Sequence, residues 1–172
     1  MSVSETIKAR RSIRAYQNKS LSGELVDKLS EALLWAPSAG NLQSRKFYFV
    51  YNNTIKQALA QATHGQNFIL QAPLVIVGCA DIAKVEPRYG LRGTSLFALQ
   101  DVAASIQNLM LVAQENGLGT VWIGAFDEDR AAKALKLPNY LRPVIIVPVG
   151  YSAQKPMAPP RVSQQEAIEI IE

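Results

Sequence analysis

Apolar residues recur at intervals of three and four along several segments of the chain, which places them on one face of an α-helix. Serine, asparagine or aspartate, the residues that favour helix starts, precede most of these segments. The pattern predicts helices from Val3 into the first arginines, over 23–36 after Ser22, from a cap at Asn53 to Ala62, over 94–116, from Asp127 to Leu137, and after Ser163. The 94–116 segment is apolar on more than one stripe, so we expect it to be buried on two sides, in the core or against a second subunit.

Shorter segments rich in β-branched and aromatic residues predict strands. They are Phe47–Tyr51, Leu74–Ala80, Thr120–Ile123 and Pro143–Val149. Leu74–Ala80 is continuously apolar, as expected of a central strand buried on both faces. Pro148 places its strand near an edge or a bulge, because proline cannot donate to a strand ladder. The alternation of helices and strands, taken alone, favours a parallel α/β fold.

Three segments have the composition of connections. Pro37–Gln43 carries a hydroxyl and two amides, so it either approaches a ligand or is an ordinary loop. Residues 83–93 contain two glycines and a proline, and we expect a mobile loop beside a pocket. Residues 155–161 hold three prolines and must be extended.

The segment from Arg10 to Tyr16 concentrates positive charge directly after the first predicted helix. If it is extended from Ser12 onward, alternate side chains share a face, so Ser12, Arg14 and Tyr16 point one way. Ile13 and Ala15 would then face the core. Arginine pairs with phosphate through two parallel hydrogen bonds, so this face suits an anionic ligand. A solvated basic stretch remains the alternative interpretation.

The composition fits one globular domain over 172 residues, with 48% hydrophobic and 19% charged residues. The net charge of +4 is too mild and too dispersed for nucleic-acid binding, which needs a dense basic stripe, and a small anionic ligand fits better. We expect a soluble cytoplasmic protein without membrane association. No signal peptide opens the chain, and no apolar run approaches the length of a membrane span.

Motifs for catalysis by side chains alone are missing from the sequence. The single cysteine, Cys79, lies in a buried strand pattern, and the single histidine, His64, has no neighbouring ligands for a metal. Gly117-x-Gly119 lacks the third glycine of a dinucleotide fingerprint and follows a helix, not a strand. If the protein is an enzyme, a bound organic cofactor carries the chemistry.

Several motifs, in the right order along nearly the whole chain, resemble the flavin-dependent nitroreductase family in its short form. Each motif alone is weak, and the combination is specific. The motifs are Arg10-Arg11-Ser12-Ile13-Arg14-Ala15-Tyr16, Ala36-Pro37-Ser38-Ala39-Gly40-Asn41-Leu42-Gln43, Gly117 to Phe126, Leu141 to Tyr151, and Pro160-Arg161.

The resemblance implies an α+β fold with a central, mixed, mostly antiparallel sheet flanked by helices, and it overrides the parallel alternative. It implies an intertwined homodimer that holds FMN at the subunit interface, with the 94–116 helix in that interface. It also implies hydride transfer from NADH or NADPH to flavin N5, and then electron transfer to nitroaromatics, quinones or similar acceptors in a ping-pong mechanism. Neither a catalytic side chain nor a metal is required.

The resemblance also assigns roles to residues of this chain. Arg10 and Ser12 resemble contacts to the phosphate or the ribityl chain, Arg161 a second phosphate contact, and Arg14 the cation near flavin N1 and O2. Residues of the loop at 37–43 resemble those that reach the flavin from the partner subunit, and the turn after Ile123 resembles the backbone that approaches N5 and O4. The full expected set is Arg10, Arg11, Ser12, Arg14, Pro37, Ser38, Ala39, Asn41, Gln43, Gln66, Ile123, Gly124, Ala125 and Arg161.

Two departures from the family pattern affect this expectation. Many members have Pro-Trp where this chain has Ser44-Arg45, so the shape of the preceding loop is open. Longer members carry an inserted helical segment over the pocket, and only residues 83–93 are available here, so substrate-contacting residues do not transfer. A flavin-binding redox sensor without turnover, or a flavoenzyme of the same fold with another reaction (dehalogenation, enoyl-type reduction, flavin fragmentation), stays an alternative.

Overall fold

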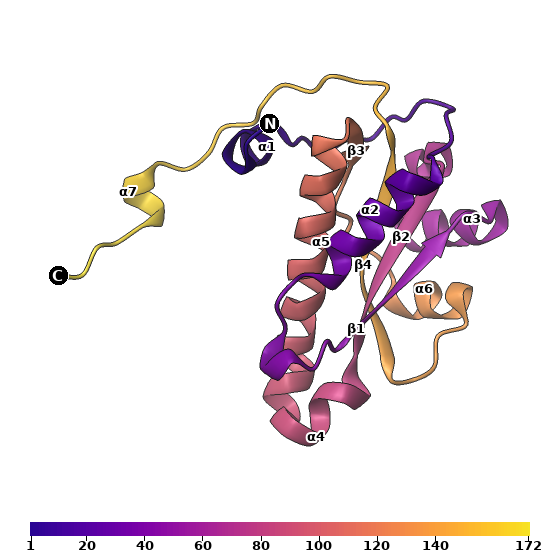
Figure 1. Cartoon of the computed structure of the whole chain (residues 1–172). Helices are drawn as coiled ribbons and strands as arrows, with labels where there is room; N and C mark the ends of the chain where they lie inside the picture. Colours follow the sequence, from indigo (N-terminus) through magenta and orange to yellow (C-terminus); the bar gives the residue numbers. More distant parts are fainter.

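The computed structural model describes residues 1–172 as a four-stranded sheet covered by helices on both faces (Figure 1). The strands are β1 (Arg45–Val50), β2 (Leu74–Asp81), β3 (Leu118–Thr120) and β4 (Leu141–Tyr151). The helices are α1 (Val3–Ala9), α2 (Gly23–Leu34), α3 (Asn53–Ala62), α4 (Ile82–Arg92), α5 (Ala98–Glu115), α6 (Glu128–Leu135) and α7 (Gln164–Ala167). Three short helical turns complete the chain: η1 (Ala39–Asn41), η2 (Asn67–Gln71) and η3 (Gly93–Phe97).

The strands follow the order β1-β2-β4-β3, and every neighbouring pair is antiparallel. The helix–strand alternation alone favoured a parallel sheet, and this expectation was wrong because the connections do not run back across one face to a neighbouring parallel strand. The one parallel contact is an isolated bridge between Ser12 and Thr120. The α+β fold with a mostly antiparallel sheet, which the family resemblance implied, is confirmed.

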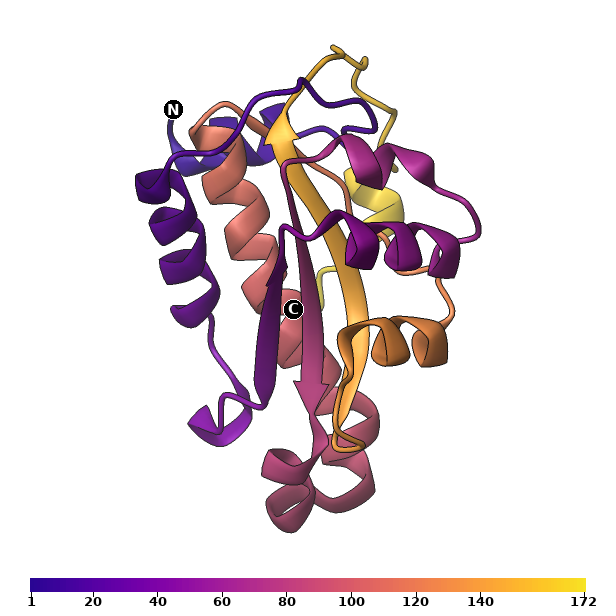
Figure 2. The ribbon, with the colours of Figure 1, turned by 90° about the vertical axis from the view of Figure 1, so that its right-hand side faces the viewer.

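Strand β2 is buried along its whole length, as the continuous apolar run predicts. Its side chains alternate between two separate apolar clusters, one on each face of the sheet. Val75 and Val77 face α3, α6 and η2, whereas Leu74 and Ile76 face α2 and α5. Figure 2 shows these two helical layers on opposite sides of the strands.

The predicted helix starts are largely confirmed. Ser22, Asp127 and Ser163 cap α2, α6 and α7, and Ser2 forms a capping box with Glu5 at α1. The cap of α3 lies one residue earlier than expected, because the side chain of Asn52, not Asn53, accepts the helical N–H. Short polar side chains therefore define most helix boundaries in this chain.

The N-terminal segment departs from simple alternation. Tyr16 is buried with Ile13 in the cluster beneath α3 and α6, and it does not share a face with Arg14, which is exposed. The Tyr16 hydroxyl donates to the carbonyls of Ile13 (2.7 Å) and Pro148 (3.2 Å). The segment makes only isolated bridges to the sheet, so no continuous ladder enforces a period of two.

Pro148 lies in the central strand β4, paired with Val75, and the expectation of an edge or a bulge was wrong. Ile146 exchanges two backbone hydrogen bonds of 3.0 Å with Ile123, and Pro148, two residues further on, points its backbone to the same side. On that side β3 has already ended at Thr120, and Tyr16 occupies the space. A proline is tolerated because no strand partner requires its N–H there.

The expected mobile loop at 83–93 is the helix α4, which was missed because it contains Pro87 and a kink at Gly90 (φ 52°). Together with η3 and α5 it makes a helical stretch of 34 residues, Ile82–Glu115, that by length and composition is apolar enough to cross a membrane. The expectation of no such segment is therefore corrected. In this fold α5 instead packs its apolar residues on the sheet and on α2, so it is a core helix.

The C-terminal tail after β4 is extended through the prolines, as predicted, and nearly all of its side chains are exposed. It leaves the body of the molecule and ends in α7 and an extended terminus (Figure 1). Ile170 and Ile171 are 79% and 92% exposed. A tail that carries apolar side chains without packing them on its own chain is available to a second molecule.

Candidate functional site

A cavity of about 450 Å³ lies between the segment after α1 and the C-terminal tail. Residues from the two ends of the chain line it, and none of them is acidic. They are Arg10, Arg11, Ser12, Arg14, Pro156, Met157, Pro159 and Arg161. The structure thus brings together all the arginines of the expected set with Ser12, although Arg161 is far from the others in sequence.

The sheet fixes the position of the basic segment. Helix α1 ends at Arg10, where the backbone becomes extended, and the N–H of Ile13 donates to the carbonyl of Thr120 at 2.9 Å. The side chain of Ile13 packs directly against the backbone of Gly119, where a Cβ would lie 2.7 Å from it. Glycine at position 119 therefore lets the basic segment lie close against β3.

The arginines of the cavity lack negative partners. The Nη1 atom of Arg10 is buried without any hydrogen-bond partner. Burial lowers the pKa of the Arg10 guanidinium, and the neighbouring charges of Arg161 and Arg11 lower it further. Arg11 donates only to backbone carbonyls, those of Lys8 (2.6 Å) and Arg10 (2.9 Å). An anion in the cavity would satisfy the buried donor and neutralise the mutual repulsion.

The second group of expected residues lies in the loop of residues 37–43. It contains the turn η1, and three successive or nearly successive residues have left-handed backbone conformations: Gly40 (φ 56°), Asn41 (φ 56°) and Gln43 (φ 51°). The Ser38 hydroxyl accepts a hydrogen bond of 3.0 Å from the N–H of Gln43 and closes the loop. Asn41 and Gln43 are exposed, so their side chains are free to contact a ligand.

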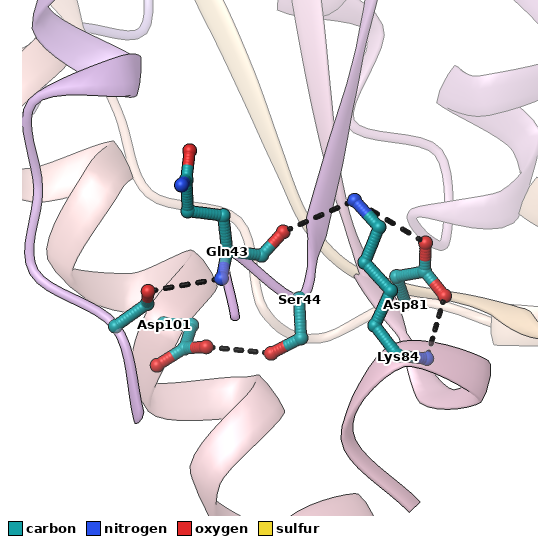
Figure 3. A network of polar contacts seen from close by, with 6 residues as sticks. Gln43, Ser44, Asp81, Lys84 and Asp101 are labelled. Atoms are coloured by element: carbon teal, nitrogen blue, oxygen red, sulfur yellow. Dashed lines mark hydrogen bonds and ion pairs between the residues drawn. The ribbon is translucent and has the colours of Figure 1, made fainter. Parts of the chain in front are cut away.

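A buried carboxylate holds this loop on α5. Asp101 is 4% exposed, and it accepts hydrogen bonds from the Ala39 N–H (2.9 Å) and from the hydroxyl of the fully buried Ser44. Figure 3 shows the Ser44 hydroxyl directed at the Asp101 carboxylate. The side chain of Asp101 is therefore fully engaged in fixing the loop, and it is one of the few charges that are buried here.

Arg45, the neighbour of Ser44, completes the attachment. Its guanidinium donates to the carbonyls of Leu34 (3.0 Å), Ala36 (2.7 Å) and Pro37 (3.0 Å) at the end of α2. Burial lowers the pKa of Arg45, and the Asp101 charge opposes that shift. Ser44 and Arg45 stand where many family members have Pro-Trp. Together with Asp101 they form a polar clamp that holds the loop.

The loop and the arginine cavity lie at opposite ends of α5. Asp101, which holds the loop, is in the first turn of α5, and Gln114 near its other end lines a groove with Arg11. The two positions are about 20 Å apart along the helix axis. Within one chain the loop does not border the arginine cavity.

Comparison with known proteins identifies the family. The family model described as "Nitroreductase family" matches residues 7–81 and 61–151. The chain belongs to the nitroreductase family. A relative from Methanothermobacter thermautotrophicus, named for NADH dehydrogenase and NAD(P)H nitroreductase, is 33% identical over 160 residues, covering 91% of this chain and 80% of the relative. The NAD(P)H-linked FMN reductase of Bacillus subtilis is 29% identical over 95% of this chain and 72% of its own length.

Solved structures agree with this assignment. The NADPH:FMN oxidoreductase of Vibrio harveyi, complexed with NAD⁺, superposes with a TM-score of 0.91 at 25% identity, over 99% of this chain and 77% of its own. NfrA2 of B. megaterium superposes with a TM-score of 0.89 at 27% identity, over 97% of this chain and 73% of its own. The chain is an oxidoreductase of the nitroreductase family, whose named relatives are NAD(P)H nitroreductases and FMN reductases.

The remaining expected residues of the nitroreductase site lie outside the arginine cavity. Ile123 is paired with Ile146 beside β4, and Gly124 and Ala125 follow it as an exposed turn. Gln66 lies in the connection from α3 to η2, which the hydrogen bond from the Asp127 N–H to the Ala62 carbonyl (2.9 Å) brings close to that turn. These residues form a separate group on the α3–α6 side of the sheet.

Some residues around the site were missed from the sequence. Pro156, Met157 and Pro159 line the cavity only because the extended tail crosses it, and no local pattern indicates this. Gln71 accepts a hydrogen bond of 3.2 Å from the Tyr16 N–H, a contact across 55 positions. Asp101 had a usable signal, because an acidic residue within a long and mostly apolar predicted helix requires buried partners.

Proposed function

We propose that this protein binds FMN at the arginine cavity and acts as an FMN-dependent oxidoreductase that uses NADH or NADPH. The observation that carries the proposal is the unpartnered, buried Nη1 of Arg10 in a cavity lined by four arginines and no acid. A phosphate supplies the oxygen acceptors and the negative charge that these residues lack, so the residues present fit the phosphate end of FMN.

Each cavity residue has a distinct part in this proposal. Arg10, Arg11 and Arg161 hold the phosphate by charge-assisted hydrogen bonds, and the Ser12 hydroxyl contacts the phosphate or the ribityl chain. Arg14, exposed at the same cavity, lies at the pyrimidine end, where its positive charge stabilises the negative charge that gathers on a reduced ring. Ile123, Gly124 and Ala125 provide backbone near N5 and O4, and Gln66 contacts the pyrimidine edge.

The loop with Pro37, Ser38, Ala39, Asn41 and Gln43 completes the site of a second subunit. Two features support this arrangement: the loop is about 20 Å from the arginine cavity of its own chain, and the C-terminal tail leaves its own chain with exposed apolar residues. The 172 residues thus act as one folded unit in an intertwined homodimer with two FMN sites, and we place that dimer in the cytoplasm.

FMN held by Arg10, Arg11, Ser12 and Arg161 would supply the redox chemistry, which is hydride acceptance from NADH or NADPH at N5 and electron delivery to nitroaromatics, quinones or similar acceptors in a ping-pong cycle. The chain's own contribution is to bind and orient. The loop and the exposed turn after Ile123 position the reacting rings, and fixed orientation of two reactants supplies much of the rate without an acid or base.

Anaerobic mixing of the purified, FMN-loaded protein with NADH or NADPH tests the proposal. We expect the visible absorbance of oxidised flavin to disappear with at least one donor and to return when a quinone or a nitroaromatic is added. Retained flavin that neither donor bleaches would contradict the oxidoreductase and favour a flavin-binding sensor. A protein that does not retain FMN would contradict the site itself.

A further inference from the structure

Helix α4 carries a second group of cations, at the opposite end of the molecule from the arginine cavity. Lys84, Arg88 and Arg92 are all exposed. Lys84 is paired only with Asp81, at 3.9 Å, and no carboxylate lies within 4.0 Å of Arg88 or Arg92. Residues 84 and 88 are four positions apart, so they share one face of the helix.

Two of these cations are attached to the loop of residues 37–43. Arg88 Nη1 donates to the Gly40 carbonyl and Lys84 Nζ donates to the Gln43 carbonyl, both at 3.4 Å. A Cβ on Gly40 would lie 2.5 Å from the Tyr89 hydroxyl, so loop and helix are in direct contact. Figure 3 shows Lys84 between Gln43 and Asp81. Since Asp101 fixes the other side of the loop, any site that the loop borders also has these cations at its rim.

Aromatic rings preorganise the two arginines. The Arg88 guanidinium lies 5.3 Å from the centroid of the Tyr89 ring, and the Arg92 guanidinium lies 5.4 Å from that of Phe97. The two rings pack edge to face, with their centroids 5.2 Å apart. A guanidinium that rests on a ring face still has its N–H edge free for a two-point contact with an anion.

We infer that Arg88 and Arg92, supported by Lys84, bind the 2′-phosphate of NADPH and make NADPH the preferred hydride donor. The inference rests on the proposed function, in which the loop borders the flavin of the partner subunit. A dinucleotide whose nicotinamide reaches the flavin leaves its adenosine half at the rim of the site. The 2′-phosphate is the group that distinguishes NADPH from NADH, and arginine is the residue that accommodates it.

The same surface does not suit the free 2′-hydroxyl of NADH. Dinucleotide sites that select NADH commonly pair the ribose 2′-hydroxyl with a carboxylate acceptor. Two acids lie near these cations in the chain. Glu86, which is exposed, is two positions from both Lys84 and Arg88 and therefore lies on the other side of the helix. Asp81 is engaged: it is 9% exposed, caps α4 through the Lys84 N–H at 3.3 Å and pairs with the Lys84 ammonium. The face of α4 that carries Lys84 and Arg88 therefore offers cations without a free acceptor.

The test compares Arg88→Gln, Arg92→Gln and the double variant with the matched control Lys133→Gln, an exposed lysine on α6. For each FMN-loaded protein, kcat/KM is measured with NADPH and with NADH, and binding of adenosine 2′,5′-bisphosphate and of AMP is measured by calorimetry. We expect each arginine variant to lower kcat/KM for NADPH by roughly tenfold, because one charge-assisted contact is lost. Values for NADH should change less than about twofold. The bisphosphate should bind wild type more tightly than AMP, and this advantage should disappear in the double variant.

Equal losses with NADPH and NADH, or no loss with either, would overturn the inference. A wild-type preference for NADH would overturn it as well. In each of these cases the samples should still retain FMN and be bleached by NADH, so the proposed function would stand. A failure of the proposed function would instead appear as loss of flavin, or as loss of bleaching with both donors.

Discussion

The arginine cavity and the polar clamp formed by Asp101, Ser44 and Arg45 hold their charged side chains in opposite ways. In the clamp, the Asp101 carboxylate, the Ser44 hydroxyl and the Arg45 guanidinium are buried and all have partners within the chain. In the cavity, charges of one sign gather, and the buried Nη1 of Arg10 has no partner.

The difference separates a structural use of charge from a binding use. A fully satisfied buried network fixes one conformation and leaves nothing for a ligand. An unsatisfied cluster of like charges costs stability and is relieved by an anion, so the protein's own stability and its affinity for a phosphate are linked. Changes in the clamp should therefore act on folding, whereas changes in the cavity should act on the cofactor.

The largest expected effect is on the clamp. Asp101→Asn keeps the size of the side chain but removes the charge and one acceptor, leaving the Ala39 N–H or the Ser44 hydroxyl poorly paired and Arg45 without its nearby charge. We expect a loss of about 3 kcal/mol in the free energy of unfolding, measured by urea denaturation. Asp27→Asn, an exposed position on α2, should stay within about 0.5 kcal/mol of wild type. A loss below about 1 kcal/mol for Asp101→Asn would mean that the clamp does not hold the loop.

A smaller effect distinguishes two arginines within the cavity. Arg161→Ala should weaken FMN binding by roughly 10- to 100-fold, because a charge-assisted contact to phosphate is lost, with little change in the rate of flavin reduction. Arg14→Ala should slow reduction by a similar factor while weakening FMN binding less. Equilibrium dialysis gives the first quantity and anaerobic stopped-flow absorbance the second. If both variants affected retention equally and neither affected reduction, the division of roles would be wrong.

The smallest effect is expected for an exposed ion pair outside both regions. Its contribution to the free energy of unfolding is the reference against which the effects in the clamp and the cavity are compared. Arg142 contacts Glu128 with two hydrogen bonds, of 2.7 and 2.8 Å, and the hydrogen bond from Arg142 lowers the pKa of Glu128. Both side chains are nearly half exposed, so Arg142→Gln should cost only about 0.5 kcal/mol at pH 7. Because the Glu128 pKa is depressed in the folded state, this contribution should disappear as the pH falls through that pKa. Urea denaturation at pH 7 and near pH 3 measures it, and a cost that persists in acid would contradict the assignment.

The sequence predicts local structure better than it predicts how segments meet. The caps at Ser22, Asp127 and Ser163 and the buried strand β2 follow from local spacing, and they are confirmed. Strand direction depends on contacts between distant segments, so the parallel alternative could not be dismissed by pattern alone. Helix α4 was hidden because Pro87 and Gly90 have loop propensities that its packing overrides.

The candidate site shows the same difference between what local sequence predicts and what depends on contacts between distant segments. Local charge density pointed to Arg10, Arg11 and Arg14, and the structure places them on one cavity. The position of Arg161 on that cavity came from the family resemblance, because the contact spans most of the chain. The clamp could not be foreseen from the loop sequence, since Ser44 and Arg45 acquire their roles only when α5 brings Asp101 beside them.

The central claim is that each FMN site combines the arginine cavity of one subunit with the loop of the other, and a mixed dimer tests it most directly. One subunit carries Arg10→Gln with Arg161→Gln, the other carries Ser38→Ala with Asn41→Asp, and different tags allow the heterodimer to be isolated. Each variant homodimer should bind FMN weakly. We predict that the heterodimer binds one FMN with wild-type affinity, because one of its two sites then holds no substitution and the other holds all of them. A heterodimer without any tight site would contradict the account, because it would show that cavity and loop serve the same site within one chain.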